Sequence, residues 1–244
     1  MSKYAIISDI HGNMIALQEV MKDLNTQGDI AGVILLGDFI DYGPQSNEVV
    51  SFLRDEFPYK ILCNIWGNHE RAIMLSDYSN FSSQRGVDSA KFTRSILTDT
   101  TLEYLDLEVE HSGKYEFEID GFKVLAVHGS LEDYYWKSIL PDNVRGDYSS
   151  YDIVLSGHSH YSHMFTKFYD SDNPKMRNKH KVLFINPGSV GQPRNHNNNA
   201  QYTILDTDTI RVDMRAVTYN IDSVIDLFDD RVDEFYKSRL ITGV

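Results

Sequence analysis

Short apolar runs recur along the chain, and each run ends in a cluster of small or polar residues. Six segments share this pattern, and they begin at Tyr4, Gly32, Lys60, Phe122, Tyr151 and Lys181. Their Val, Ile and Leu residues are contiguous rather than alternating, which is typical of strands covered on both faces. Between the first of these segments, the spacing of apolar residues predicts helices over 13–24 and 47–57. Strands that alternate with helices predict an α/β fold.

The rest of the chain adds further elements. Residues 71–107 are expected to be mostly helical and to cover the sheet. Residues 201–205 and 209–217 are expected to form a strand pair that ends a second sheet. Two polar stretches, 169–180 and 194–200, are expected to be exposed loops.

The C-terminal region carries an apolar stripe at helical spacing. It predicts an amphipathic helix at about 221–241. The stripe fits equally well against the body of the protein or against a partner subunit, so a homo-oligomer remains an open alternative. No linker rich in Pro, Gly or Ser interrupts the chain, which favours a single domain over 1–244.

Polar clusters with chemical potential follow five of the predicted strands. They contain Asp9 with His11, Asp38, Asn68 with His69, His128, and His158 with His160. Taken alone, each cluster is more typical of a turn, a helix cap or a hydrogen-bonded loop histidine. Their recurrence at successive strand ends instead indicates a ligand site at one rim of the sheet. Seven nitrogen and oxygen ligands without a thiolate suit two metal ions that share a bridge.

Composition and charge narrow the function further. The 244 residues are 41% hydrophobic and 24% charged, as in soluble globular proteins. We find neither a signal peptide nor an apolar run of about 18 residues, and Cys63 is the only cysteine, so a cytoplasmic protein is expected. The net charge of −13 argues against long nucleic acids and anionic membranes as partners. A small anionic substrate remains compatible, because bound divalent cations invert the local potential.

The motif series D-x-H, G-D-x-x-D, G-N-H-E, H and G-H-x-H, in this order, resembles the calcineurin-like metallophosphoesterase superfamily. The resemblance runs from Tyr4 to about Arg194. The segment NPGSVGQPR, from Asn186, is similar to the small bacterial branch that contains simple phosphodiesterases. The resemblance implies a four-layer αββα sandwich, in which two mixed β-sheets are flanked by helices.

The resemblance also implies two metal sites joined by one bridging carboxylate. The first site would contain Asp9, His11, Asp38 and His160, and the second Asp38, Asn68, His128 and His158. A hydroxide that bridges the two ions would attack phosphorus in line. Manganese, iron or both are the expected ions, and zinc would fit the same ligands.

His69 is the one motif histidine that the family does not place on a metal, so it is expected to protonate the leaving oxygen or stabilise the transferring group. In the related phosphoprotein phosphatases an aspartate at the position of Asp41 orients this histidine, although Asp41 is also a plausible turn residue. Those phosphatases carry a phosphate-binding arginine where this chain has Tyr42. The loss of that bidentate clamp argues against a protein phosphatase.

These features favour a phosphodiesterase or a dinucleoside polyphosphate hydrolase, acting on a small phosphorylated substrate such as a nucleotide. Candidate substrate-binding residues are Tyr42, Tyr135, Trp136 and Arg194. A packed loop or dimer surface is the alternative for the aromatic residues, and solvated surface is the alternative for Arg194. A phosphomonoesterase or protein phosphatase, and a non-catalytic binding scaffold, are the alternative functions.

Overall fold

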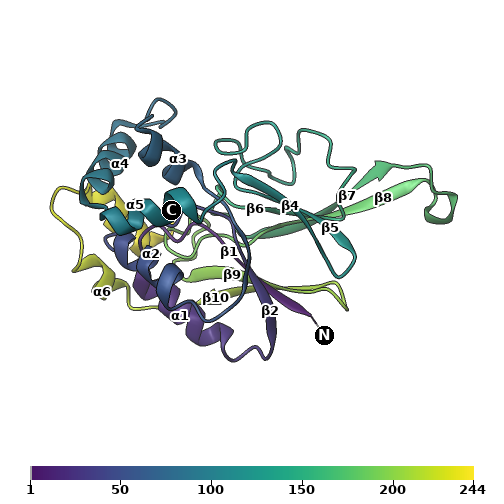
Figure 1. The fold of residues 1–244 in the computed structure, drawn as a ribbon, viewed down its shortest axis with the longest axis horizontal. Helices are drawn as coiled ribbons and strands as arrows, with labels where there is room; N and C mark the ends of the chain where they lie inside the picture. Colours follow the sequence, from purple (N-terminus) through teal and green to yellow (C-terminus); the bar gives the residue numbers. More distant parts are fainter. Residues whose placement is uncertain (1) are drawn as a thin grey trace.

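The computed structural model describes residues 2–244, and two five-stranded β-sheets form its centre (Figure 1). The first sheet has the order β10 (Arg211–Val217), β9 (Ala200–Asp206), β1 (Lys3–Ile7), β2 (Ile30–Leu35) and β3 (Ile61–Asn64). The second has the order β4 (Lys114–Ile119), β5 (Phe122–Val127), β6 (Ile153–Ser156), β8 (Lys179–Asn186) and β7 (His163–Asp170). Both sheets are mixed, with parallel strands in the interior and antiparallel strands towards an edge.

Seven α-helices and one short 3₁₀-helix accompany the sheets in the described part of the chain. They are α1 (Met14–Leu24), α2 (Ser46–Asp55), α3 (Asn68–Leu75), α4 (Gln84–Ile96), α5 (Asp99–Leu107), η1 (Pro174–Met176), α6 (Ile221–Ile225) and α7 (Glu234–Thr242). The predicted strands and the predicted helices over 13–24, 47–57 and 71–107 are therefore confirmed. At the start of α1 the Asn13 side chain accepts a hydrogen bond from the Ala16 amide (3.0 Å), a typical helix cap.

The layers follow from which strand faces are apolar. Inner faces of both sheets contribute to one buried cluster, for example Ile6 and Ile34 from the first sheet and Ala126 and Leu155 from the second. The outer face of the first sheet packs against α1 and α2. The outer face of the second sheet is covered by the non-helical segment 128–152, which contributes the fully buried Tyr148. The α/β fold of two mixed sheets with flanking helices is confirmed. The expected fourth, helical layer over the second sheet is instead the non-helical segment 128–152.

The predicted strand pair near the C-terminus forms, but it belongs to the other sheet. β9 pairs antiparallel with β1, so β9 and β10 extend the first sheet rather than end the second. Both faces of β9 are buried. Tyr202 and Ile204 pack with the apolar residues of α1 on the outer face of the sheet, and Leu205 lies between the two sheets. A strand with two buried faces must lie inside a sheet, but its apolar pattern does not indicate which of the two sheets it joins.

The prediction of one helix at about 221–241 is wrong, because two short helices replace it. α6 ends at Ile225 and α7 begins at Glu234, and the connection contains Asp229 and Asp233. Their carboxylates accept hydrogen bonds from nearby backbone amides (2.9 Å in both cases), which compete with a continuous helix. The predicted apolar stripe still packs on the body of the protein, against Ile15, Tyr42 and Phe92.

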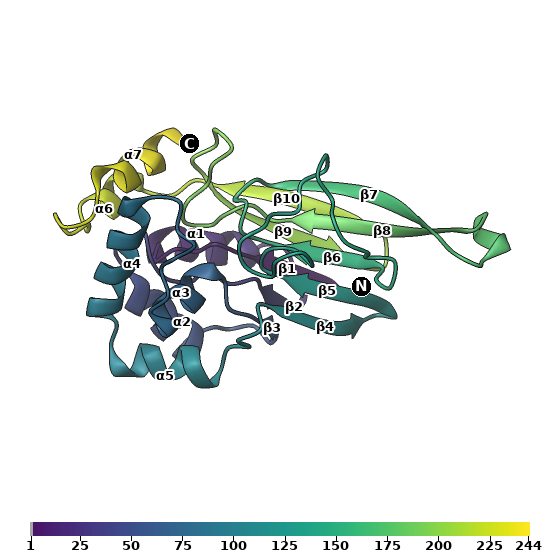
Figure 2. The ribbon, with the colours of Figure 1, turned by 90° about the horizontal axis from the view of Figure 1, so that it is seen from above.

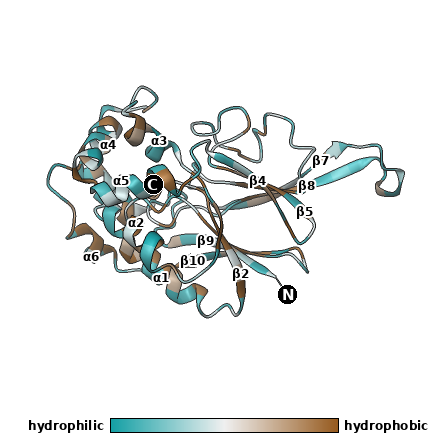
Figure 3. Cartoon of the chain, in the orientation of Figure 1, coloured by the Kyte–Doolittle hydropathy of each residue, from teal (hydrophilic) through white to brown (hydrophobic). Residues whose placement is uncertain are grey.

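The two polar stretches behave differently. β7 and β8 form a long hairpin whose hydrophilic tip, residues 171–178, projects from the body (Figures 1 and 3). The stretch 194–200 is mostly half-buried, contrary to expectation, because it is tied to the end of the chain. The His196 amide donates to the Gly243 carbonyl (2.8 Å), and the Asn198 side chain donates to the Ile241 carbonyl (3.0 Å). Over residues 2–244 no helix has the length and apolar character needed to cross a membrane.

Candidate metal centre

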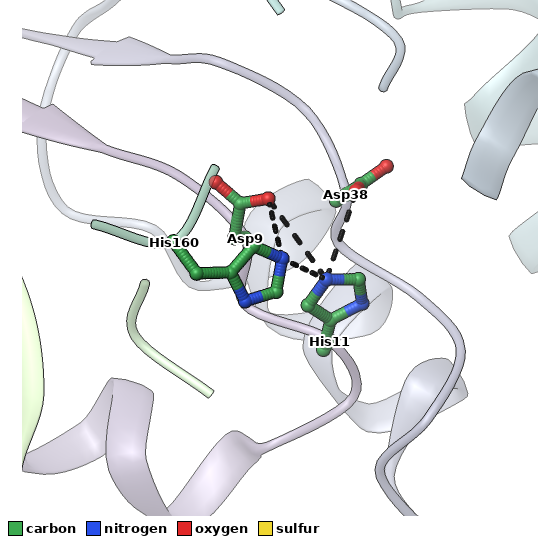
Figure 4. A group of neighbouring side chains, drawn as sticks. All are labelled: Asp9, His11, Asp38 and His160. Atoms are coloured by element: carbon green, nitrogen blue, oxygen red, sulfur yellow. Dashed lines mark hydrogen bonds and ion pairs between the residues drawn. The ribbon is translucent and has the colours of Figure 1, made fainter. Parts of the chain in front are cut away.

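The carboxyl ends of strands from both sheets meet at one place and bring the polar clusters together. The ligand atoms of Asp9, His11, Asp38 and His160 all lie within 4.8 Å of one another (Figure 4). Those of Asp38, His128 and His158 also lie within 4.8 Å of one another. Asn68, the first residue of α3, lies beside the second group. Its Oδ1 is 3.0 Å from His128 Nε2 and 2.8 Å from His158 Nδ1. All seven predicted metal ligands therefore gather at one site, and Asp38 belongs to both groups.

Left-handed backbone conformations direct these side chains inward. Five of the seven residues have positive φ, namely Asp9 (53°), His11 (47°), Asp38 (56°), His158 (63°) and His160 (58°). Residues other than glycine rarely adopt this region. On a regular strand His158 and His160 would point to opposite faces, and the turn after β6 instead aims both at the same site. Backbone strain of this kind concentrates at functional sites.

Three of the histidines are oriented by the backbone. The acceptors are the carbonyl oxygens of Ile40 for His11 (3.2 Å), Leu36 for His128 (2.7 Å) and Gln192 for His160 (2.5 Å). Because a carbonyl oxygen can only accept, each Nδ1 carries the hydrogen and donates it. In a neutral ring this leaves Nε2 with a free lone pair, which is the usual arrangement of a metal-binding histidine.

Each central carboxylate has one oxygen that is fixed by donors and one that has no partner. Asp9 Oδ2 accepts from the Ser8 hydroxyl (2.6 Å) and the His158 amide (3.1 Å), and Asp38 Oδ1 accepts from the His69 amide (2.9 Å). The other two oxygens, Asp9 Oδ1 and Asp38 Oδ2, are buried without a hydrogen bond. Burying a charged oxygen unpaired is strongly unfavourable.

The two unpaired oxygens face the histidine nitrogens. Asp38 Oδ2 is 3.6 Å from His11 Nε2 and 3.3 Å from His128 Nε2, and Asp9 Oδ1 is 3.1 Å from His160 Nε2. Carboxylate oxygens and imidazole nitrogens without thiolates are ligands for manganese, iron or zinc. The buried Asp/His cluster thus fits a dinuclear metal centre, with Asp38 between the two positions.

The pKa values agree with cation binding. Burial lowers the pKa of His158 to about 3 and lowers the pKa of His11 well below its usual value, so both rings are neutral. Burial also opposes the charge of His128, but the adjacent Asp38 carboxylate outweighs it and raises the pKa of His128 to about 9. A cation that replaces this pairing with Asp38 would displace the His128 proton, because a ligating imidazole must be neutral.

His69 and Asp41 form a buried pair beside the metal ligands. His69 Nδ1 lies 2.7 Å from Asp41 Oδ2, and the other Asp41 oxygen accepts from the Ser89 hydroxyl (2.6 Å), the Thr93 hydroxyl (2.8 Å) and the Tyr42 amide (2.8 Å). Asp41 also lies in a turn, with φ of 72°, and its role in orienting His69 for catalysis stays a prediction. Ser89 and Thr93, on α4, were not anticipated because nothing in their local sequence indicates this contact.

Glu70 is a further residue that the sequence analysis left without a role. Its buried carboxylate accepts from the backbone amides of Asp38 (2.8 Å), Phe39 (2.7 Å), Ile40 (3.2 Å) and Gly67 (2.8 Å). It therefore fixes the turn that carries the bridging carboxylate. Its place three residues after Gly67, at a helix start, is the signal that could have indicated a capping role.

A cleft of about 280 Å³ opens over the cluster. It is lined by Asp38, Tyr42, Asn68, His69, Asn80, Phe81, Ser82, Trp136, His158, His160 and Arg194. Three of the four predicted substrate-binding residues, Tyr42, Trp136 and Arg194, are among them. Tyr135 is not: its ring lies 5.2 Å from the Arg71 guanidinium and its hydroxyl donates to the His111 carbonyl. Residues 80–82, just before α4, complete the cleft and were missed.

Two mixed β-sheets with a buried Asp/His cluster at their strand ends are the architecture expected of a dinuclear metallohydrolase. Comparison with known proteins gives the family. The profile of the calcineurin-like phosphoesterase superfamily domain matches residues 3–210, and the chain belongs to this superfamily.

The chain is also similar over its full length to other proteins. An uncharacterised protein of Methanocaldococcus jannaschii is 29% identical over 256 aligned residues, covering 99% of this chain and 98% of the relative. The crystal structure of a metallophosphoesterase from Sphaerobacter thermophilus is 25% identical, with a TM-score of 0.72 and coverage of 100% and 99%. A hypothetical protein from Pyrococcus horikoshii shares the fold at 21% identity, with a TM-score of 0.79 and the same coverage.

Proposed function

We propose that this protein is a dimetal-dependent phosphoesterase that hydrolyses a phosphodiester or a phosphoanhydride, and that its substrate is a small nucleotide such as a dinucleoside polyphosphate. One observation carries the proposal. Two buried carboxylate oxygens without partners, Asp9 Oδ1 and Asp38 Oδ2, face imidazole nitrogens at the floor of a cleft that His69 also lines. The proposed ions are manganese, iron or both, held by the two ligand groups described above.

When bound, two such ions activate a water for in-line attack and neutralise the phosphoryl oxygens. The chain itself supplies the general acid. Asp41 binds His69 Nδ1, which leaves the other ring nitrogen to donate a proton to the leaving oxygen. Ser89 and Thr93 hold the Asp41 carboxylate in place, so the orientation of His69 is fixed before substrate binds.

The cleft favours a diester or anhydride over a simple monoester. Tyr42 stands in the position of the missing phosphate clamp, and its ring lies 4.7 Å from the His11 ring and 4.4 Å from the His69 ring. Phe81 and Trp136 are in edge contact at 5.3 Å and add aromatic surface for a second substituent. A base that stacks on such a surface gains ~1–3 kcal/mol. A cytoplasmic location stays a prediction.

A phosphomonoesterase or protein phosphatase remains the first alternative, and it would hydrolyse monoesters faster than diesters. A non-catalytic scaffold is less well supported, because every predicted ligand and His69 is present at the site.

The test uses purified protein, Mn²⁺ and diadenosine tetraphosphate, with products separated by anion-exchange chromatography. Parallel reactions contain EDTA, the His69→Ala variant, or His180→Ala as a matched control far from the cleft. ATP with AMP would indicate attack near one end of the bridge, and ADP alone would indicate attack at its centre. Cleavage of bis-p-nitrophenyl phosphate without loss of the tetraphosphate would refute the nucleotide substrate. Metal binding without turnover of any phosphoester would refute the enzyme.

A further inference from the structure

The C-terminal segment, which lies beyond the family match at residues 3–210, returns to the candidate active site. Figure 2 shows α7 at the same end of the molecule as α4. The Tyr236 ring on α7 stacks on Tyr42 at 4.5 Å, with an angle of 23° between the planes. The Tyr236 carbonyl also accepts from the side chain of Gln192 (3.4 Å), the residue whose own carbonyl orients His160. α7 therefore supports one wall of the cleft.

Three arginines surround this contact. Arg194 lines the cleft itself, and its Nε is buried without a hydrogen-bond partner. Arg239, on α7, lies 4.3 Å from the centre of the Phe235 ring, and Arg85, on α4, lies 4.0 Å from the centre of the same ring. Within residues 2–244, none of the three guanidinium groups forms an ion pair with a carboxylate side chain.

This concentration of positive charge contrasts with the rest of the protein. The chain has 36 acidic and 23 basic residues, so carboxylates outnumber cationic side chains in the molecule as a whole. Burial lowers the pKa of Arg239 to about 10, and the positive charge of Arg194 contributes to the same shift. Arg194 and Arg239 are half-buried, whereas Arg85 is exposed. Half-buried guanidinium groups without a carboxylate side chain as partner are unfavourable, and they suit planar recognition of phosphate.

Arg194 and Arg239 are both tied to the C-terminal end of α7. The loop that follows Arg194 is hydrogen-bonded to the end of α7 through His196 and Asn198. Arg239 Nε donates to the Val244 carbonyl (2.8 Å), which fixes its stem and leaves its remaining donors for other partners. Tyr42, which lines the cleft together with Arg194, stacks on Tyr236, three residues before Arg239 in α7.

We propose that Arg194 and Arg239 form an anion subsite that binds phosphate groups of the substrate other than the one that reacts. This inference rests on the proposed function and narrows the substrate class to phosphoanhydrides with at least two phosphates. Arg194 Nε would find its missing acceptor in a phosphate oxygen. Arg85 adds positive charge from the α4 side of Phe235. The positive charge lost where Tyr42 replaces an arginine is thus supplied from a different part of the chain.

The first test measures binding of inorganic tripolyphosphate to EDTA-treated protein by isothermal titration calorimetry. Arg194→Gln and Arg239→Gln should each weaken binding by roughly 10- to 100-fold, the loss expected for one charge-assisted contact. Arg231→Gln is the matched control, because Arg231 is exposed and paired with Asp229 (2.7 Å) in the connection before α7. Arg239→Lys, which retains the charge, should bind more tightly than Arg239→Gln. Unchanged binding in both glutamine variants, or an equal loss in Arg231→Gln, would overturn the subsite.

The second test compares two substrates in the presence of Mn²⁺. For diadenosine tetraphosphate, kcat/KM should fall by about the same factor in Arg194→Gln and Arg239→Gln, mainly through KM. For bis-p-nitrophenyl phosphate, which has no second phosphate, it should change by less than about threefold. An equal loss on both substrates would overturn the inference. If the parent protein hydrolyses no phosphoester, the proposed function fails, and tripolyphosphate binding still decides whether the anion subsite exists.

Discussion

The buried pair of His69 and Asp41 gives the sharpest prediction, through the substitution Asp41→Asn. One Asp41 oxygen accepts from three donors, and the other faces His69 Nδ1 at 2.7 Å. The asparagine carbonyl should take the three-donor position, because an amide nitrogen cannot accept hydrogen bonds. The amide nitrogen then faces His69 Nδ1 and donates to it. The imidazolium form of His69 therefore loses its carboxylate partner.

The magnitude follows from this one contact. A hydrogen bond to a charged group contributes about 1.5–3 kcal/mol, which corresponds to roughly a 10- to 100-fold decrease in kcat. Burial lowers the pKa of His69, but Asp38 and the hydrogen-bonded Asp41 outweigh burial and raise it. Removing the Asp41 charge lowers that pKa again. Because the protonated form donates to the leaving oxygen, the alkaline limb of the pH–rate profile should move to lower pH.

The assay separates acid catalysis from general damage. An alkoxide leaving group needs a proton, whereas p-nitrophenolate leaves without one. Asp41→Asn should therefore slow a diester with an alcohol leaving group by the full factor and slow bis-p-nitrophenyl phosphate by much less. Metal content, measured by mass spectrometry, should not change, because Asp41 lies outside both ligand groups. Equal slowing of both substrates, or loss of metal, would refute the role assigned to His69.

Three further predictions concern metal and stability. Asp38→Ala should abolish binding of both ions, whereas His128→Ala should weaken the binding of one ion more than that of the other. Titration with Mn²⁺ after EDTA treatment measures the affinity of each site. Equal losses of affinity at the two sites in His128→Ala would contradict the two-group arrangement. Asp23→Ala should lower the free energy of unfolding by about 1–3 kcal/mol, read from urea unfolding, because Asp23 binds Arg215 (2.7 Å) and the Tyr202 hydroxyl (2.7 Å) and ties α1 to β9 and β10. The hydrogen bond with Arg215 lowers the pKa of Asp23 in the folded state. The stability that Asp23 contributes is therefore present above its unfolded pKa of about 4 and is lost as the pH falls through its folded pKa. An Asp23→Ala effect on the free energy of unfolding that is the same at pH 7 and pH 3 would contradict this reasoning.

Local sequence determined the parts of the site that lie on strand ends. Several ligands directly follow apolar strands, namely Asp9, His11, Asp38 and the two histidines after β6. Because strand ends of an α/β fold meet at one rim of the sheet, the sequence alone predicted that these side chains lie together. Long-range pairing was less accessible. The placement of β9 beside β1 depends on which edge of which sheet is free, and neither strand's composition carries that information.

The C-terminal region shows a different limit. The apolar stripe from Val224 to Leu240 correctly indicated which residues are buried, but aspartate hydrogen bonds to the backbone interrupted the predicted helix. The contact of Tyr236 with Tyr42 joins residues that are far apart in the chain, and no local pattern in either segment predicts it. The same holds for Ser89 and Thr93, whose role depends entirely on how α4 packs.

Unusual backbone conformations support the arrangement of the candidate metal centre. Left-handed residues at five of the seven ligand positions each cost roughly 1–3 kcal/mol, so they persist only where the surrounding structure holds them. Glu70 provides that support at Asp38, because its buried carboxylate binds four backbone amides around the Asp38 turn. A side chain at Gly67 would also overlap Asp38, so the approach of α3 to β2 requires glycine there. Backbone contacts within the chain therefore hold the ligand side chains in the arrangement that the two sites require.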